Sequence, residues 1–130
     1  MKYLLDTNVI IDHFKGDTKA VSFIQINEQA GLAVSVISVA EVLEGLAGQP
    51  KEKQRQEDFE EFLSATRVID IDAKIAEMFA KMRSNLRKMG KLIDNFDLLI
   101  ASTALEFKLT LVTDDRDFER INGLKLKSIQ

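Results

Sequence analysis

The hydrophobic residues of this chain fall into short uninterrupted runs separated by longer amphipathic stretches. Apolar or β-branched runs occupy residues 3–5, 33–37 and 109–112, and a brief alternating run occupies residues 67–71. An uninterrupted apolar run bounded by turn-forming residues is typical of a strand buried on both faces of a parallel sheet. With a last edge strand over residues 124–129, the pattern predicts about five strands.

Between these runs, apolar residues recur every three to four positions, which is the period of an amphipathic helix. We expect helices over residues 9–14, 18–30, 51–63, 73–89, 96–107 and 114–121, and another that Ser38 opens and Gly45, Gly48 and Pro50 stop. Strands alternate with helices along the whole chain. The sequence therefore predicts an α/β fold with a central, mainly parallel sheet flanked by helices.

The composition is that of an ordinary globular protein, and 130 residues fit one domain, residues 1–130. The absence of cysteine excludes disulfides and thiolate metal sites. No apolar run approaches the roughly 18 residues that span a bilayer, and Asp6 interrupts the only N-terminal one, so we expect a cytoplasmic protein without a membrane segment. A net charge of −3 argues against binding nucleic acid mainly through a basic surface.

Acidic residues follow the predicted strands or begin the predicted helices at four places. They are Asp6, Glu41, Asp94, Asp97, Asp114, Asp115 and Asp117. Because the carboxyl ends of parallel strands meet at one edge of a sheet, these carboxylates could share one pocket. Clustered carboxylates repel one another unless a cation compensates, and Mg²⁺ and Mn²⁺ prefer such oxygen ligands. The same ions serve the hydrolysis of phosphodiesters.

Each acid also has a purely structural interpretation. Asp6 suits a helix cap, and the segment from Ser38 to Glu41 matches a capping box. Asp97 lies in a first helical turn, where the helix dipole favours negative charge. The three acids of residues 114–117 could cap the last short helix. Their coincidence at every strand-to-helix junction nevertheless favours a shared site.

Taken together, the motifs resemble those of the PIN-domain ribonucleases, and among them the VapC-type toxins of type II toxin–antitoxin modules. The similarity runs nearly from end to end. Its motifs are Leu5-Asp6-Thr7-Asn8, Ser38-Val39-Ala40-Glu41 with Gly45, Asp97-Leu98-Leu99-Ile100-Ala101, Val112-Thr113-Asp114-Asp115-Arg116-Asp117-Phe118 and Ile121-Asn122-Gly123-Leu124.

This resemblance implies a PIN-like fold in which Asp6, Glu41 and Asp97 are catalytic, metal-binding acids. The fourth acid corresponds best to Asp115, with Asp114 and Asp117 as alternatives. Asp94 is interpreted mainly as a helix cap, with a role as an outer metal ligand as the alternative. The polar neighbours suited to orienting carboxylates or water are Thr7, Asn8, Ser38 and Thr113.

The resemblance also implies a Mg²⁺- or Mn²⁺-dependent endoribonuclease that cleaves RNA and inhibits translation as a toxin. It implies a homodimer and a cognate antitoxin as partners. A cluster of cations has two interpretations, a solvated surface or a set of phosphate contacts beside the acids. Its members are Arg83, Arg87, Lys88 and Lys91.

Two other classes of protein are alternatives to an RNA hydrolase. A phospho-receiver domain needs a lone phosphoacceptor Asp after a middle strand, and neither Asp70 nor Asp72 has that placement. The remaining alternative is a non-catalytic domain that binds protein through its acidic pocket. His13, the only histidine, cannot form a zinc site without a second such ligand and is assigned a structural or surface role.

Overall fold

The computed structural model describes residues 1–130 and contains one five-stranded sheet. The strands are β1 (Tyr3–Leu5), β2 (Leu32–Ser35), β3 (Arg67–Ile69), β4 (Thr110–Val112) and β5 (Leu126–Lys127). They lie in the order β3-β2-β1-β4-β5, and each neighbouring pair is parallel. The predicted α/β class and parallel sheet are confirmed.

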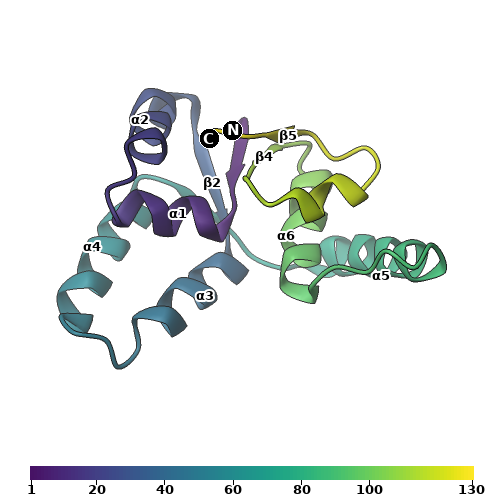
Figure 1. The fold of residues 1–130 in the computed structure, drawn as a ribbon, viewed down its shortest axis with the longest axis horizontal. Coiled ribbons are helices and arrows are strands. Elements are labelled where there is room, and N and C mark those ends of the chain that lie inside the picture. Colours follow the sequence, from purple (N-terminus) through teal and green to yellow (C-terminus); the bar gives the residue numbers. More distant parts are fainter.

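Helices cover both faces of this sheet. They are α1 (Thr7–Phe14), α2 (Thr18–Asn27), α3 (Val36–Leu46), α4 (Glu52–Ser64), α5 (Ala73–Lys88) and α6 (Asn95–Glu106), with 3-10 helices η1 (Glu28–Ala30) and η2 (Arg116–Arg120). Figure 1 shows α1 to α4 on one side of the strands and α5 and α6 on the other. None of these helices is long and apolar enough to cross a membrane.

Strand residues alternate between two hydrophobic cores, because successive side chains of a strand point to opposite faces. Leu4, Ala33 and Leu111 pack in the core beneath α5 and α6. Tyr3, Leu5, Leu32, Val34 and Val112 pack in the core on the α1 to α4 side. Burial on both faces explains why the strands lack the polar alternation of a half-exposed sheet.

The second strand ends earlier than its β-branched run suggested. It stops at Ser35, which pairs with Ile69, the last residue of β3, so no neighbour on that side extends further. The Ser35 hydroxyl accepts a hydrogen bond from the Ile37 N–H and caps α3. The prediction that Ser38 opens this helix is therefore wrong. Ser38 lies inside α3 and is fully buried.

Two predicted helices are also shorter than expected. The helix predicted over residues 18–30 gives way to η1 after Asn27, and the chain leaves at Gly31 with a φ of 86°. The helix predicted over residues 114–121 is the five-residue η2, capped by Asp115. Both regions still connect the predicted strands, so the topology is unchanged.

Candidate active site

Asp6 lies at the carboxyl end of the central strand β1 and is 3% exposed. Its Oδ1 accepts a 2.8 Å hydrogen bond from the Thr7 N–H, and its Oδ2 accepts a 2.7 Å hydrogen bond from the Thr113 hydroxyl. Asp6 therefore caps α1 and also points into the edge where β1 and β4 end. Burial raises the pKa of Asp6, although both hydrogen bonds oppose this rise.

Glu41 reaches the same edge from α3 and is held by Thr7. Its Oε1 accepts a 2.7 Å hydrogen bond from the Thr7 hydroxyl, whose oxygen lies 2.8 Å from Ser38 Oγ. Since Thr7 has one hydroxyl hydrogen, the Ser38 hydroxyl is the donor in the second contact. The capping-box interpretation of Ser38 and Glu41 is thus wrong, because Ser35 is the helix cap and Glu41 accepts its hydrogen bond from Thr7, the first residue of α1.

Asp97 lies in the first turn of α6, where the Asp94 carboxylate caps the helix by accepting from the N–H groups of Phe96 and Asp97. Partial burial raises the pKa of Asp97 to about 7, and the nearby charges of Asp6, Asp94, Asp115 and Glu41 add to the rise. Of the carboxylates predicted to meet at the sheet edge, these five therefore lie near one another. No Lys or Arg forms an ion pair with any of the five.

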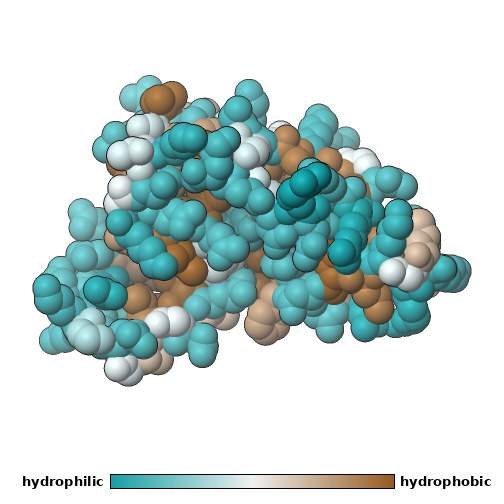
Figure 2. Space-filling view, viewed as in Figure 1, coloured by the Kyte–Doolittle hydropathy of each residue, from teal (hydrophilic) through white to brown (hydrophobic).

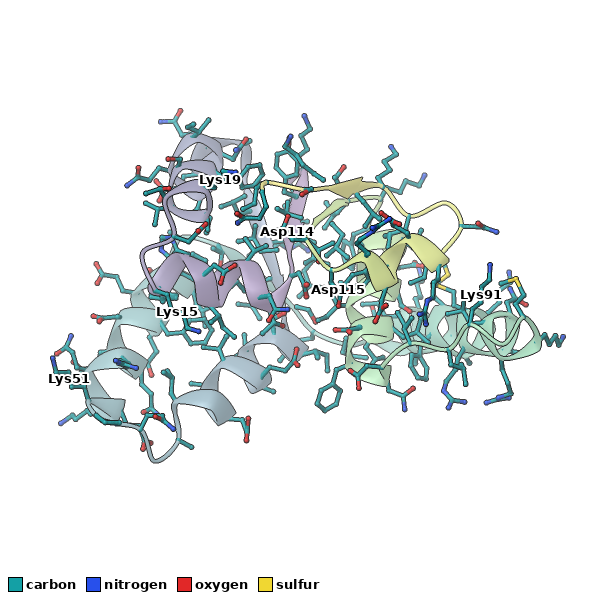
Figure 3. All side chains as sticks on the ribbon, viewed as in Figure 1. Lys15, Lys19, Lys51, Lys91, Asp114 and Asp115 are labelled. Atoms are coloured by element: carbon teal, nitrogen blue, oxygen red, sulfur yellow. The ribbon has the colours of Figure 1, made fainter.

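The three neighbouring candidates for the fourth acid have different surroundings. Asp114 accepts hydrogen bonds from the Ser128 hydroxyl and the Ile129 N–H, which tie it to the C-terminal segment. Asp117 is exposed and lies 3.6 Å from Arg120. Asp115 is the one whose charge acts on both Asp6 and Asp97. Figure 3 shows Asp115 near the centre of the molecule.

The polar neighbours predicted to orient the acids behave differently from one another. Thr7, Ser38 and Thr113 are buried and hydrogen-bonded within the cluster. Thr113 also accepts a 3.0 Å hydrogen bond from the Asp115 N–H, so it contacts two of the acids. Asn8 is exposed, and its side chain makes no hydrogen bond.

The acid set has the chemistry of a site for a hard divalent cation. Its ligands would be carboxylate oxygens. Burial raises the pKa of both Asp6 and Asp97, and the neighbouring carboxylates add to the rise. No three of these carboxylates lie close enough together to hold one ion in this structure.

The basic residues singled out from the sequence line α5 beyond the acids. Arg83 Nε donates a 3.0 Å hydrogen bond to Asn95 Oδ1, two residues before Asp97. Arg87, Lys88 and Lys91 are exposed and have no carboxylate partner within 4.0 Å. Figure 3 shows Lys91 at one end of the molecule, by the end of α5.

A hollow of about 570 Å³ opens beside Glu41 between α1, α3 and α4. Its lining includes Ile11, Phe14, Glu41, Val42, Gly45, Leu46, Arg55 and Phe59. Figure 2 shows hydrophobic surface among hydrophilic atoms in this part of the molecule. Sequence alone did not single out Phe14, which is 43% exposed and packs on Phe59 and Phe62. Its position at the end of α1, three residues after the apolar run that ends at Ile11, gave no sign of exposure.

His13 belongs to the neighbouring aromatic cluster. Its ring lies 4.9 Å from that of Phe14 and 5.4 Å from that of Phe62, measured between centroids. Burial lowers the pKa of His13, so the neutral ring is favoured among these aromatic neighbours. This packing is consistent with the structural role assigned to His13.

Comparison with known proteins extends the similarity over the whole fold. A family model described as PIN domain matches residues 3–124. The chain is 34% identical over 131 residues to Ribonuclease VapC2 of Rickettsia felis, covering 98% of both proteins. It is 29% identical over 126 residues to the tRNA(fMet)-specific endonuclease VapC of Shigella flexneri, covering 96% of both.

Solved structures with the same fold come from toxin–antitoxin complexes. VapBC2 from Rickettsia felis, bound to a DNA fragment from its promoter, aligns with a TM-score of 0.92 at 32% identity, covering 100% of both chains. DNA-bound VapBC from Salmonella typhimurium aligns with a TM-score of 0.93 at 26% identity, covering 100% of this chain and 99% of that one.

Proposed function

Because this chain belongs to the PIN-domain family and to its VapC-type ribonucleases, we propose that it is a divalent-metal-dependent endoribonuclease and the toxin of a toxin–antitoxin pair. We take residues 1–130 as one such domain. Its RNA substrate places it in the cytoplasm, where cleavage inhibits translation. The observation that carries the proposal is the cluster of carboxylates around Asp97, which no basic side chain neutralises.

In this proposal Asp6, Glu41, Asp97 and Asp115 hold Mg²⁺ or Mn²⁺ through carboxylate oxygens. When bound, such an ion activates water and stabilises the charge that develops on the phosphate during hydrolysis. Two threonine hydroxyls orient two of these carboxylates by hydrogen bonds, Thr113 donating to Asp6 and Thr7 to Glu41. Asp94 acts one step further out, since its carboxylate fixes the first turn of α6 that carries Asp97.

The exposed cations of α5 supply the attraction for RNA that the net charge of −3 does not. Arg83 and Arg87 are four residues apart on one helix, so they lie on the same face. Lys88 and Lys91 continue the positive charge to the end of that helix. Because Arg87, Lys88 and Lys91 are exposed and have no acidic partner, they are free to contact phosphates of the RNA.

A VapB-type antitoxin docks in the hollow between α1, α3 and α4. This hollow has a mixed lining of apolar and charged side chains, and Glu41 lies in its wall, so an occupant reaches the acid cluster directly. The similar structures of VapBC2 from Rickettsia felis and VapBC from Salmonella typhimurium are complexes of this kind. We also propose that two copies of the chain form a homodimer.

The competing function is a non-catalytic module that binds protein through the acid cluster. A module of this kind has no need for the hydrogen bonds that hold Asp6 and Glu41, each on its own threonine, in fixed orientations. These orienting contacts favour the enzyme.

The deciding experiment compares wild type with Asp97→Asn on a panel of RNAs, with Mg²⁺ or Mn²⁺ and with EDTA. The panel includes initiator tRNA, because the Shigella flexneri relative is named for that substrate. We expect metal-dependent cuts by wild type that are lost in Asp97→Asn, which keeps the shape of the side chain and removes its charge. Metal-dependent stabilisation against heating is read on the same samples. Cuts that persist in the variant would identify a contaminating ribonuclease, and the absence of both cuts and stabilisation would leave the binding module.

A further inference from the structure

A second cavity, of about 370 Å³, lies between the C-terminal half of α5 and the end of η2. It is lined by Met82, Asn85, Leu86, Lys88, Met89, Arg120, Ile121 and Asn122. The apolar floor is formed by the buried residues Met82, Leu86 and Ile121. Two cations and two carboxamides surround that floor, a combination that suits a ligand with a negative charge and a flat polar ring.

Arg120 is held in place at the wall of this cavity. Its Nη1 donates a 3.0 Å hydrogen bond to the Leu92 carbonyl, and its Nη2 lies 3.6 Å from Asp117. These contacts use two positions of a guanidinium that has five N–H donors, so donors remain for a ligand. Lys88 has no acidic partner within 4.0 Å.

The cations are not needed to terminate α5. Gly90, with a φ of 66°, ends the helix, and the N–H groups of Gly90 and Lys91 donate to the carbonyls of Arg87 and Leu86. This arrangement already satisfies helix carbonyls that a terminal lysine would otherwise bind. The side chain of Lys88 therefore has no structural task at the helix end.

The cavity is joined to the acid cluster through short, ordered segments. Asp115 caps η2, and Arg120 ends that helix and contacts the carbonyl of Leu92, two residues before the cap of α6 at Asp94. In Figure 3 Asp115 lies near the centre of the molecule and Lys91 at its end, by the end of α5. Arg120, in the wall of the cavity, thus links the segment that follows Asp115 to the segment that precedes Asp94.

We propose that the cavity binds one nucleotide of the RNA, outside the bond that is cut. This inference rests on the proposed ribonuclease function. Lys88 and Arg120 bind its phosphate. Asn85 and Asn122 hydrogen-bond the edge of its base, since a carboxamide both donates and accepts. The thioether of Met89, which is 50% exposed, covers the face of the base. The nucleotide belongs to a single-stranded segment, because only an unpaired base can turn into a cavity.

The first test uses the methionine methyl groups as reporters. The chain has four methionines, and Met1 and Met78 are outside the cavity lining, so they serve as internal controls. Nucleoside 5′-monophosphates at millimolar concentration are titrated into protein labelled at the methionine methyl carbons. We expect the NMR signals of Met82 and Met89 to move, and inorganic phosphate or the nucleoside alone to move them less. Unmoved Met82 and Met89 signals with every monophosphate would overturn the proposal.

The second test measures cleavage of an RNA that wild type cuts. Lys88→Glu and Asn122→Ala alter the cavity at exposed positions, and Lys53→Glu makes the same charge change on exposed α4. We expect Lys88→Glu to raise KM about tenfold with little change in kcat, and Lys53→Glu to match wild type. If wild type cleaves the RNA and Lys88→Glu has the same KM, the cavity proposal is wrong and the proposed ribonuclease function still holds. The absence of any metal-dependent cleavage by wild type would instead refute the proposed ribonuclease function.

Discussion

The hydroxyl of Thr113 donates a 2.7 Å hydrogen bond to Oδ2 of Asp6, although 107 residues separate the two positions. The same hydroxyl oxygen accepts from the N–H of Asp115. One buried side chain thus orients a carboxylate at the end of β1 and the backbone of a second acid after β4. This relationship links the geometry of the acid cluster to the pairing of β1 with β4.

Removing the Thr113 hydroxyl is expected to impair cleavage without unfolding the protein. Thr113→Val keeps the shape of the buried side chain but removes the hydrogen bond to Asp6 Oδ2. The pKa of Asp6 then rises further, because this hydrogen bond lowers it. We expect about a 10- to 100-fold loss of kcat/KM. Thr113→Ser keeps a hydroxyl and should recover most activity. Equal losses in both variants would indicate a packing defect rather than a lost hydrogen bond.

The contact between Thr7 and Glu41 makes a parallel prediction. Thr7→Val removes the donor to Glu41 and leaves the buried Ser38 hydroxyl without its acceptor. We expect about a tenfold or greater loss of kcat/KM and a stability loss of about 1 kcal/mol. Thr7→Ser restores the donor. Cleavage assays paired with denaturant melts separate the two effects, and full activity in Thr7→Val would show that this contact does not position Glu41.

The three acids after β4 should respond differently to neutralisation. Asp115→Asn is expected to lower cleavage about 100-fold, because Asp115 is the one whose charge reaches Asp6 and Asp97. Asp117→Asn should change cleavage less than about threefold, since Asp117 is exposed and pairs with Arg120. Asp114→Asn should mainly loosen the C-terminal segment that its carboxylate holds. A larger activity loss in Asp114→Asn than in Asp115→Asn would reassign the fourth acid.

The contribution of Asp97 to the stability of the metal-free protein should fall as the pH rises from about 4 to 7. In this window the unfolded chain releases the proton of Asp97, whose unperturbed pKa is 3.8, whereas the folded chain retains it until the pH passes about 7. Asp97→Asn has no carboxyl group to ionise, so it does not lose stability in this way. At pH 8 we expect it to be more stable than wild type by about 1 kcal/mol, a figure reduced because Asp97 is partly exposed to solvent.

Thermal melts at pH 4 and pH 8 check this prediction. The difference between variant and wild type should be about 4 °C at pH 8 and vanish near pH 4. Adding Mn²⁺ at pH 8 should reverse the order, because the cation stabilises the ionised carboxylates of wild type more than those of the variant. A pH-independent difference would show that the charge of Asp97 is not the cause.

Filling the hollow at Gly45 should separate antitoxin binding from cleavage. A Cβ added at Gly45 meets no atom within 4 Å, so a larger side chain is accommodated without disturbing α3. Gly45→Gln projects into the hollow, and we expect cleavage within about threefold of wild type but at least tenfold weaker inhibition by the cognate antitoxin. Gly45→Ala is the matched control. Unchanged inhibition of Gly45→Gln would place the antitoxin elsewhere.

Much of the fold could be predicted from local pattern because its physical causes are local. The uninterrupted run at Tyr3–Leu5 reports burial on both faces of the sheet, and the apolar period of α5 reports its single buried side. Gly31 and Gly90 fit the positive φ values that end helices. Boundaries were less certain, because β-branched residues such as Val36 and Ile37 suit a strand even where no neighbouring strand remains to pair.

The order of elements along the chain was enough to predict that acids follow strands ending at one edge, and that Asp6, Glu41 and Asp97 could share a pocket there. The polar groups that complete the cluster depend on how the elements pack. Glu41 turns to Thr7 instead of its own helix end, Asp114 turns to the C-terminal segment, and Asn8 stays in solvent. Local spacing sets the position of a side chain along the chain. Its partner is set by contacts between residues 31, 34 or 107 positions apart, which form only when the strands pair.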